Sequence, residues 1–153
     1  MIDLHTHTFF SDGVLIPSEL ARRARVKGYR ALGITDHVDA SNVEVLVPQL
    51  VHVCERLNKL GKLVVVPGVE VTHVPPEDLG AVVDSARSAG AQLIVVHGET
   101  TVEPVAPGTN RAALELDINV LAHPGLITKQ EAALAARRGI ALELSARRGH
   151  SLS

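Results

Sequence analysis

Short aliphatic segments alternate along this chain with longer segments in which apolar and polar residues recur at helical spacing. Each aliphatic segment is bounded by turn residues and is too short for an independent helix. Such segments are typical of parallel strands that are buried on both faces. The expected strands span residues 1–4, 31–35, 63–66, 92–96, 120–122 and 140–144.

The segments between these strands carry the start and stop signals of helices. A proline or a capping residue at the start, and a glycine just past the end, is the expected asymmetry. We therefore expect helices from Pro17 to Gly28, from Val43 to Leu60, from Pro75 to near Gly90, and from a Thr128–Glu131 capping box to Gly139. A further helix is expected to begin at residues 108–111.

Gly28, Gly61 and Gly90 recur at intervals of about 30 residues, the length of one β/α unit. Six such units predict a single α/β domain over residues 1–153, either a parallel barrel or a doubly wound sheet. The sequence contains neither a GxGxxG nor a P-loop pattern, which weakens the case for a nucleotide-binding sheet. We therefore favour the barrel.

The composition of the chain narrows the range of functions to consider. The net charge is −2 and the basic residues form no stripe, so no nucleic-acid partner is expected. No apolar run approaches the roughly 20 residues that span a bilayer. The single cysteine, Cys54, excludes an internal disulfide and is expected to serve in packing, which favours a reducing cytoplasm.

Histidines and acids stand at the ends of five consecutive predicted strands. They are His5 and His7, Asp36 and His37, Glu70, His97, and His123. In a β/α barrel the carboxyl ends of the strands share one face, so these side chains should converge. Imidazoles and carboxylates bind zinc, manganese or iron, which predicts a metal site, although each could merely cap its strand. Of the remaining histidines, His73 could reach the rim of this site, and His52 is expected within a helix as a surface or packing residue. The role of His150 stays open.

Five motifs in order resemble those of the PHP (polymerase and histidinol phosphatase) superfamily. They are residues 3–8 with Ser11-Asp12-Gly13, then residues 34–37, 67–70, 96–99 and 122–125. The resemblance implies a distorted (β/α)7 barrel of the TIM-like type, shortened here to about six β/α units. It also implies a cluster of up to three divalent metal ions, Zn, Mn or Fe.

The resemblance assigns ligands residue by residue. His5 and His7 would bind one metal, Glu70 would bridge it to a second held with His97 and His123, and Asp12 and His37 would contribute to a third. The implied reaction is hydrolysis of a small phosphorylated substrate by metal-activated water. His37, Glu70 and Arg111 are the candidates for direct roles in catalysis, Arg111 because a helix N-terminus with an arginine suits phosphate.

Other residues could support this site. Asp36 and Glu99 are candidates to orient the imidazoles. Arg147 or Arg148 could bind phosphate in the way suggested for Arg111. An ordinary capped helix with a surface arginine explains residues 108–111 equally well.

One feature departs from the family. Its members end with an Asp-x-His motif after the last strand, whereas this sequence ends at Ser153 without one. An open barrel would expose a strand edge. We favour a shortened chain over a homo-oligomer that covers the edge or a divergent member with fewer metals. A non-catalytic metal-binding module and a metal-dependent amidohydrolase are the alternatives, the latter weakened because Lys62 precedes its strand instead of following it.

Overall fold

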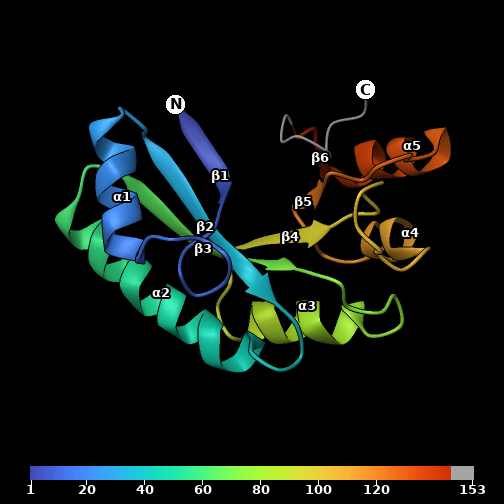
Figure 1. Ribbon diagram of the computed structural model, residues 1–153, viewed down its shortest axis with the longest axis horizontal. Coiled ribbons are helices and arrows are strands. Elements are labelled where there is room, and N and C mark those ends of the chain that lie inside the picture. Colours follow the sequence, from blue (N-terminus) through green and yellow to red (C-terminus); the bar gives the residue numbers. More distant parts are fainter. Residues whose placement is uncertain (146–153) are drawn as a thin grey trace.

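The chain folds into a curled sheet of parallel strands with helices along its outer side (Figure 1). The computed structural model describes residues 1–145. The six strands pair in sequence order and are β1 (Ile2–Thr6), β2 (Ala31–Val38), β3 (Val64–Val71), β4 (Leu93–His97), β5 (Val120–Ala122) and β6 (Ala141–Glu143). A doubly wound sheet would change direction partway, whereas this order does not. The fold is therefore an open part of a TIM-like barrel, as the sequence predicted, with six parallel strands and five connecting helices in residues 1–145.

Five helices connect the strands: α1 (Pro17–Val26), α2 (Val43–Leu60), α3 (Leu79–Ser88), α4 (Thr109–Ala113) and α5 (Lys129–Arg138). The predicted capping box is present before α5, where Thr128 accepts from the backbone of Glu131 and the Glu131 carboxylate accepts from the backbone of Thr128. α3 begins later than expected, because a turn precedes it in which the backbone N–H groups of Asp78 and Leu79 donate to the carbonyl of Pro75.

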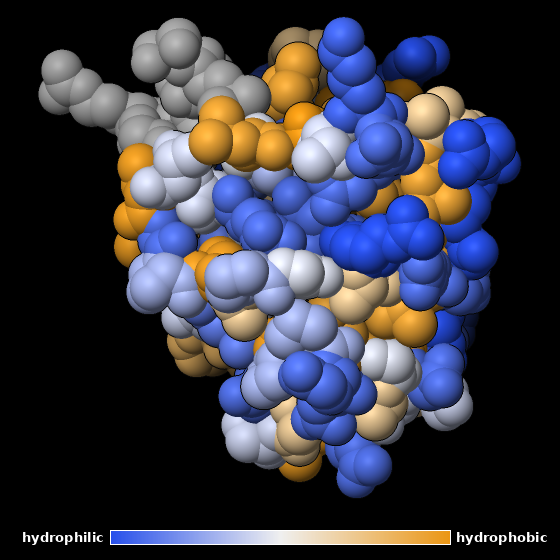
Figure 2. Space-filling model, turned by 90° about the vertical axis from the view of Figure 1, so that its right-hand side faces the viewer, coloured by the Kyte–Doolittle hydropathy of each residue, from blue (hydrophilic) through white to orange (hydrophobic). Residues whose placement is uncertain are grey.

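Buried aliphatic side chains fill the space between sheet and helices. Leu50 and Cys54 of α2 and Ile34 of β2 are fully buried in this core. Burial raises the pKa of the Cys54 thiol to about 12, so the packing role expected for this cysteine is confirmed. On the face shown in Figure 2, hydrophilic residues cover most of the surface and hydrophobic ones form small separate groups.

The strands extend further than the sequence predicted. β2 and β3 continue to Val38 and Val71, and their ladder places His37 opposite Glu70. The prediction that His5, Asp36, His37, Glu70 and His97 follow their strands is therefore wrong by a few residues. They lie within the final three residues of their strands, because backbone pairing continues there. The side chains of His5, His37, Glu70 and His97 line a shared cavity, whereas that of Asp36 does not.

β1 and β6 are the two edges of the described sheet. They face each other across a cavity of about 490 Å³ that residues of both strands line. Within residues 1–145 no backbone ladder joins them, so the open edge expected from the sequence is present in this part of the chain. Cover by a second copy stays a prediction. None of the helices in residues 1–145 is long and apolar enough to cross a membrane.

Candidate metal centre

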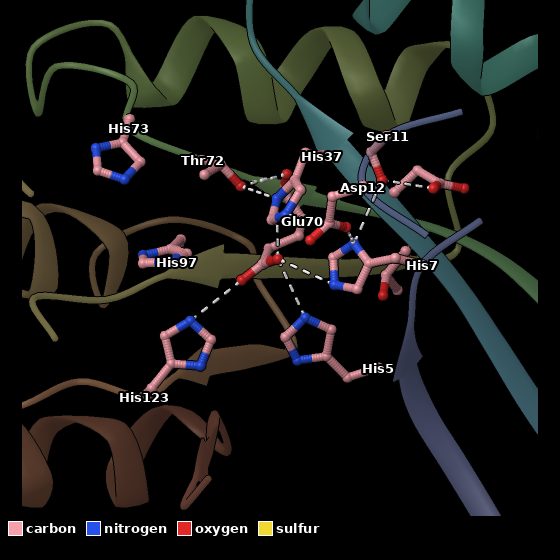
Figure 3. A network of polar contacts seen from close by, with 12 residues as sticks. His5, His7, Ser11, Asp12, His37, Glu70, Thr72, His73, His97 and His123 are labelled. Carbon is pink, nitrogen blue, oxygen red and sulfur yellow. Dashed lines mark hydrogen bonds and ion pairs between the residues drawn. The ribbon is translucent and has the colours of Figure 1, made fainter. Parts of the chain in front are cut away.

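The carboxylate of Glu70 lies at the centre of a group of imidazoles (Figure 3). Its side chain is 1% exposed, which is exceptional for an acid. Oε2 lies 3.1 Å from His37 Nδ1, 3.2 Å from His5 Nε2 and 3.4 Å from His7 Nε2. Oε1 lies 3.5 Å from His123 Nε2. The two oxygens thus face different groups of histidines.

A local irregularity of β1 brings both of its neighbouring histidines to Glu70. The β1–β2 register shifts between Asp3 and Thr6, and such a bulge redirects side chains. Thr6 fixes the strand beyond the bulge by donating to the Gly33 carbonyl at 2.6 Å. Because alternate residues of a strand share a face, His5 and His7 both enter the cavity, with ring centroids 5.1 Å apart.

The loop after β1 adds a second acid to the group. Asp12 Oδ1 lies 3.4 Å from His7 Nδ1 and 3.6 Å from His37 Nε2. The loop is held by buried Asp36, whose carboxylate accepts from the Thr8 backbone and hydroxyl and from the Ser11 hydroxyl. Asp36 therefore positions the loop that carries Asp12. The sequence suggested that Asp36 orients an imidazole, but the hydrogen bonds of its carboxylate within residues 1–145 go to this loop instead.

His97 and His123 complete the cluster from β4 and from the turn after β5. Their rings meet edge to face with centroids 4.4 Å apart. His97 Nδ1 lies 3.1 Å from the Gly98 carbonyl. The turn after His123 needs Gly125, whose φ is 59° and where an added Cβ would lie 1.9 Å from the Glu99 carbonyl oxygen. The absence of a Cβ at Gly125 therefore lets the turn after His123 pass close to the loop after His97.

Four further side chains contact the cluster and were missed by the sequence reasoning. Glu143 Oε2 accepts from His5 Nδ1 at 2.5 Å, Thr72 bonds His37 Nδ1 at 2.6 Å, Ser11 lies 3.5 Å from His7 Nδ1, and Glu103 lies 3.2 Å from His97 Nε2. Glu143 ends β6, so extending the search for acids at strand ends to the sixth strand would have found it. Glu103 lies in an irregular loop, for which the strand rhythm offers no signal.

Charge pairing changes the protonation of this group. Burial lowers the pKa of His5, but the contacts with Glu143 and Glu70 outweigh it and raise that pKa to about 10. The same balance raises the pKa of His123 to about 9. Burial raises the pKa of Glu143, but His123 and His5 bring it down to about 2. Burial likewise opposes ionisation of Glu70, and the imidazoles of His123, His37 and His5 overcome it and hold its pKa below the usual range.

The pKa values of the other three imidazoles of the centre shift in different directions. Burial dominates for His7 and His97 and lowers the pKa of each. For His37, burial also opposes the charged form, but the hydrogen bond with Glu70 raises its pKa. The cluster therefore combines imidazoles with carboxylates, and these residue types are the donors found in transition-metal sites.

The donor atoms also fit divalent ions in their spacing. Ligands at about 2.0–2.2 Å from a tetrahedral ion lie about 3.3–3.6 Å from one another, close to the contacts around Glu70. Around Glu70, three groups have donor atoms within 4.8 Å of one another, namely His5–His7–Glu70, His7–Asp12–His37 and Glu70–His97–His123, and a fourth such group, His73–His97–Glu103, lies at the rim. Moreover, His5 Nε2 and Glu70 Oε1 are buried without a hydrogen bond among residues 1–145. The structure thus brings together all seven metal ligands inferred from the sequence.

Arg111 lies apart from this group. It is exposed on α4, where its guanidinium pairs with Glu115 at 2.7 Å, and it does not line the cavity. The α4 N-terminus is already occupied by Glu99, whose Oε1 accepts from the backbone of Gly108 and Asn110. Glu99 thus caps a helix and orients no imidazole.

Two of the remaining candidate residues, His52 and His73, lie within the described part of the chain. His52 is exposed on α2, as expected. His73 reaches the rim, with Nε2 3.1 Å from Glu103 Oε2. Arg147, Arg148 and His150 lie outside the described residues.

The cluster lines a cavity of about 320 Å³ at the carboxyl ends of the strands. Asp12, Glu70, Glu103 and Glu143 all face it, whereas its lining within residues 1–145 includes no lysine or arginine. A lysine of the kind expected for an amidohydrolase is therefore not among these residues. Without cations, this cavity would repel a phosphate.

Comparison with known proteins agrees with this geometry. The chain is 46% identical over 153 residues to the uncharacterized protein MJ1295 of Methanocaldococcus jannaschii, a match that covers 99% of this chain and 70% of the relative. The model of the PHP domain matches residues 3–114, a range that includes six of the seven inferred ligands and excludes His123. The chain therefore belongs to the PHP domain family.

Proposed function

We propose that this protein is a metal-dependent hydrolase of phosphate esters, with a small phosphomonoester as the first substrate to test. The observation that carries the proposal is the Glu70 carboxylate, buried within 3.1–3.5 Å of four imidazoles. The PHP domain suggests metal-dependent phosphoesterase chemistry, which supports the proposal.

Different residues of the cluster would bind different metal ions. His5 and His7 would hold one ion together with Glu70, and His97 and His123 a second, also with Glu70, while Asp12 and His37 would contribute to a third. Zn, Mn and Fe suit this nitrogen-rich set. When bound, such ions neutralise phosphate oxygens and lower the pKa of water.

Other side chains of the protein orient the metal-binding residues. Glu143 and Thr72 bond His5 and His37, which fixes the planes of both rings. Asp36 holds the loop of Asp12 at the mouth of the cavity. When the third position holds no ion, His37, half-buried and beside both Asp12 and Glu70, would exchange a proton with a substrate in the cavity.

Metal analysis and a hydrolysis assay test the proposal together. Protein purified without chelator should contain Zn, Mn or Fe, and should hydrolyse p-nitrophenyl phosphate or bis-p-nitrophenyl phosphate when Mn²⁺ is added. His97→Ala should lose activity while the exposed His52→Ala retains it. Metal binding without hydrolysis in either protein would instead support a non-catalytic metal-binding module, and absence of metal uptake would refute both.

A further inference from the structure

We propose that His73, His97 and Glu103 form an additional divalent-cation site at the rim of the cavity, distinct from the three positions around Glu70. We call this group the rim site. The proposal rests on the metal binding proposed above, since it shares His97 with that centre. His73 and Glu103 have no part in the three groups around Glu70.

The three donor atoms of the rim site lie at ligand spacing. Glu103 Oε2 is 3.1 Å from His73 Nε2 and 3.2 Å from His97 Nε2. All three atoms lie within 4.8 Å of one another. Two ligands of one tetrahedral zinc ion are separated by about the same distance. In Figure 3, His73 lies on the His97 side of the cluster, away from Ser11 and Asp12.

The tautomer of His97 suits this role. Its Nδ1 lies 3.1 Å from the Gly98 carbonyl oxygen, which can only accept a hydrogen bond. Nδ1 therefore carries the proton, and Nε2 keeps its lone pair directed toward the cavity. The His97 ring is buried at 4% exposure, so this lone pair has a fixed direction.

The backbone of His73 is a second, independent observation. Among the described residues other than glycine, only His73 and His123 have a positive φ, at 55° and 32°. Left-handed backbone is unfavourable for a residue with a Cβ, and residues that adopt it cluster at functional sites. Both residues follow a strand, and both present an imidazole to a carboxylate of the cavity. The strain at His123 accompanies an inferred metal ligand, and His73 shows the same combination.

The donor set defines the cation. Two imidazoles and one carboxylate favour Zn²⁺, Mn²⁺ or Fe²⁺ over Mg²⁺ and Ca²⁺, which prefer oxygen. The side chains of His73 and Glu103 are 39% and 33% exposed, so the rim site is open to solvent, whereas Glu70 is not. We therefore expect the rim site to fill after the centre.

Sharing His97 links the two sites. One imidazole nitrogen offers one lone pair, so an ion in the rim site withdraws His97 from the Glu70–His97–His123 position. That position would then keep two of its protein ligands, Glu70 and His123. Excess zinc should accordingly add one bound ion while weakening the coordination of another.

Crystals of the full chain soaked in low and in saturating Zn²⁺, measured for anomalous scattering at the zinc edge, test the rim site. At saturation we expect a peak about 2.0–2.2 Å from His73 Nε2 and Glu103 Oε2. His73→Ala and Glu103→Gln should remove this peak and keep those beside Glu70. Equilibrium dialysis should show one fewer zinc equivalent in both variants than in the exposed controls His52→Ala and Glu55→Gln, with thermal unfolding confirming that each variant is folded.

The outcomes separate the two proposals. Zinc beside Glu70 with no peak at the rim at saturation would overturn the rim site and leave the proposed function standing. A rim peak that survives in both variants would overturn the assigned ligands. Zinc at neither place would overturn the rim site and the metal centre together.

Discussion

Glu143 Oε2 accepts a hydrogen bond from His5 Nδ1 at 2.5 Å and so joins the last described strand to the first. Its other oxygen lies 3.8 Å from His123 Nδ1. Because a carboxylate of this low pKa can only accept, the Nδ1 of His5 carries a proton and the Nε2 is directed to Glu70. Glu143 thus determines which nitrogen of His5 can bind a metal.

Replacing Glu143 with alanine should weaken zinc binding. Loss of a carboxylate that orients a ligating imidazole typically lowers metal affinity by about 10–100-fold, and here both His5 and His123 lose a partner. Competition for Zn²⁺ with a chromophoric chelator measures the change. Glu115→Ala is the matched control, because Glu115 is exposed and, within residues 1–145, its side chain pairs only with Arg111. Equal zinc affinity in the two variants would show that Glu143 does not orient these rings.

Replacing Glu70 with glutamine should have a larger effect. The amide keeps the volume of a fully buried side chain but removes the charge that two groups of histidines share. We expect the protein to lose two zinc equivalents at saturation and to lose hydrolysis of p-nitrophenyl phosphate. Elemental analysis after dialysis counts the equivalents. A Glu70→Gln protein with its full metal content would exclude the bridging role.

The fold was predictable because its signals are local. Residues 120–122 and Val43–Leu60 have the predicted bounds, since aliphatic runs and the glycine after α2 depend on nearby residues alone. The later ends of β2 and β3 were not predictable, because they depend on the pairing of His37 with Glu70 across the ladder.

The site was predictable where a rule of topology applies. Parallel strands bring His5, Glu70 and His123 to one face whatever their separation in sequence. The partners of these residues follow no such rule. Glu103 reaches His97 from a loop, and the carboxylates of Asp36 and Glu99 hold backbone instead of imidazoles. Which acid contacts which imidazole depends on how the loops pack, and no local sequence pattern predicts that packing.

Replacing Arg111 with alanine should leave catalysis intact. Its guanidinium forms an exposed pair with Glu115 four residues later, and such helix pairs contribute about 0.3–0.5 kcal/mol. We expect an unchanged KM for p-nitrophenyl phosphate and a barely altered melting temperature. A large rise in KM with unchanged kcat would restore to Arg111 the phosphate-binding role that the sequence suggested.

The metal-free protein should lose stability as the pH rises from 6.5 toward 10. The pKa values of His5 and His123 are raised to about 10 and about 9, so their stabilisation is complete below 6.5 and is lost as the pH rises through these values. The lowered pKa values of His7 and His97 act in the opposite sense, but the two large upward shifts should dominate.

Glu143 adds a loss of stability at acidic pH. Its pKa of about 2 gives stabilisation that is present above pH 4.5 and disappears as the pH falls toward 2. Urea unfolding in EDTA at several pH values from 4 to 10 should therefore show a maximum between about 4.5 and 6.5. Glu143→Ala should flatten the alkaline decline, because it removes one of the two carboxylates that raise both histidine pKa values. A wild-type stability that stays constant or increases up to pH 10 would contradict this account of the buried charge.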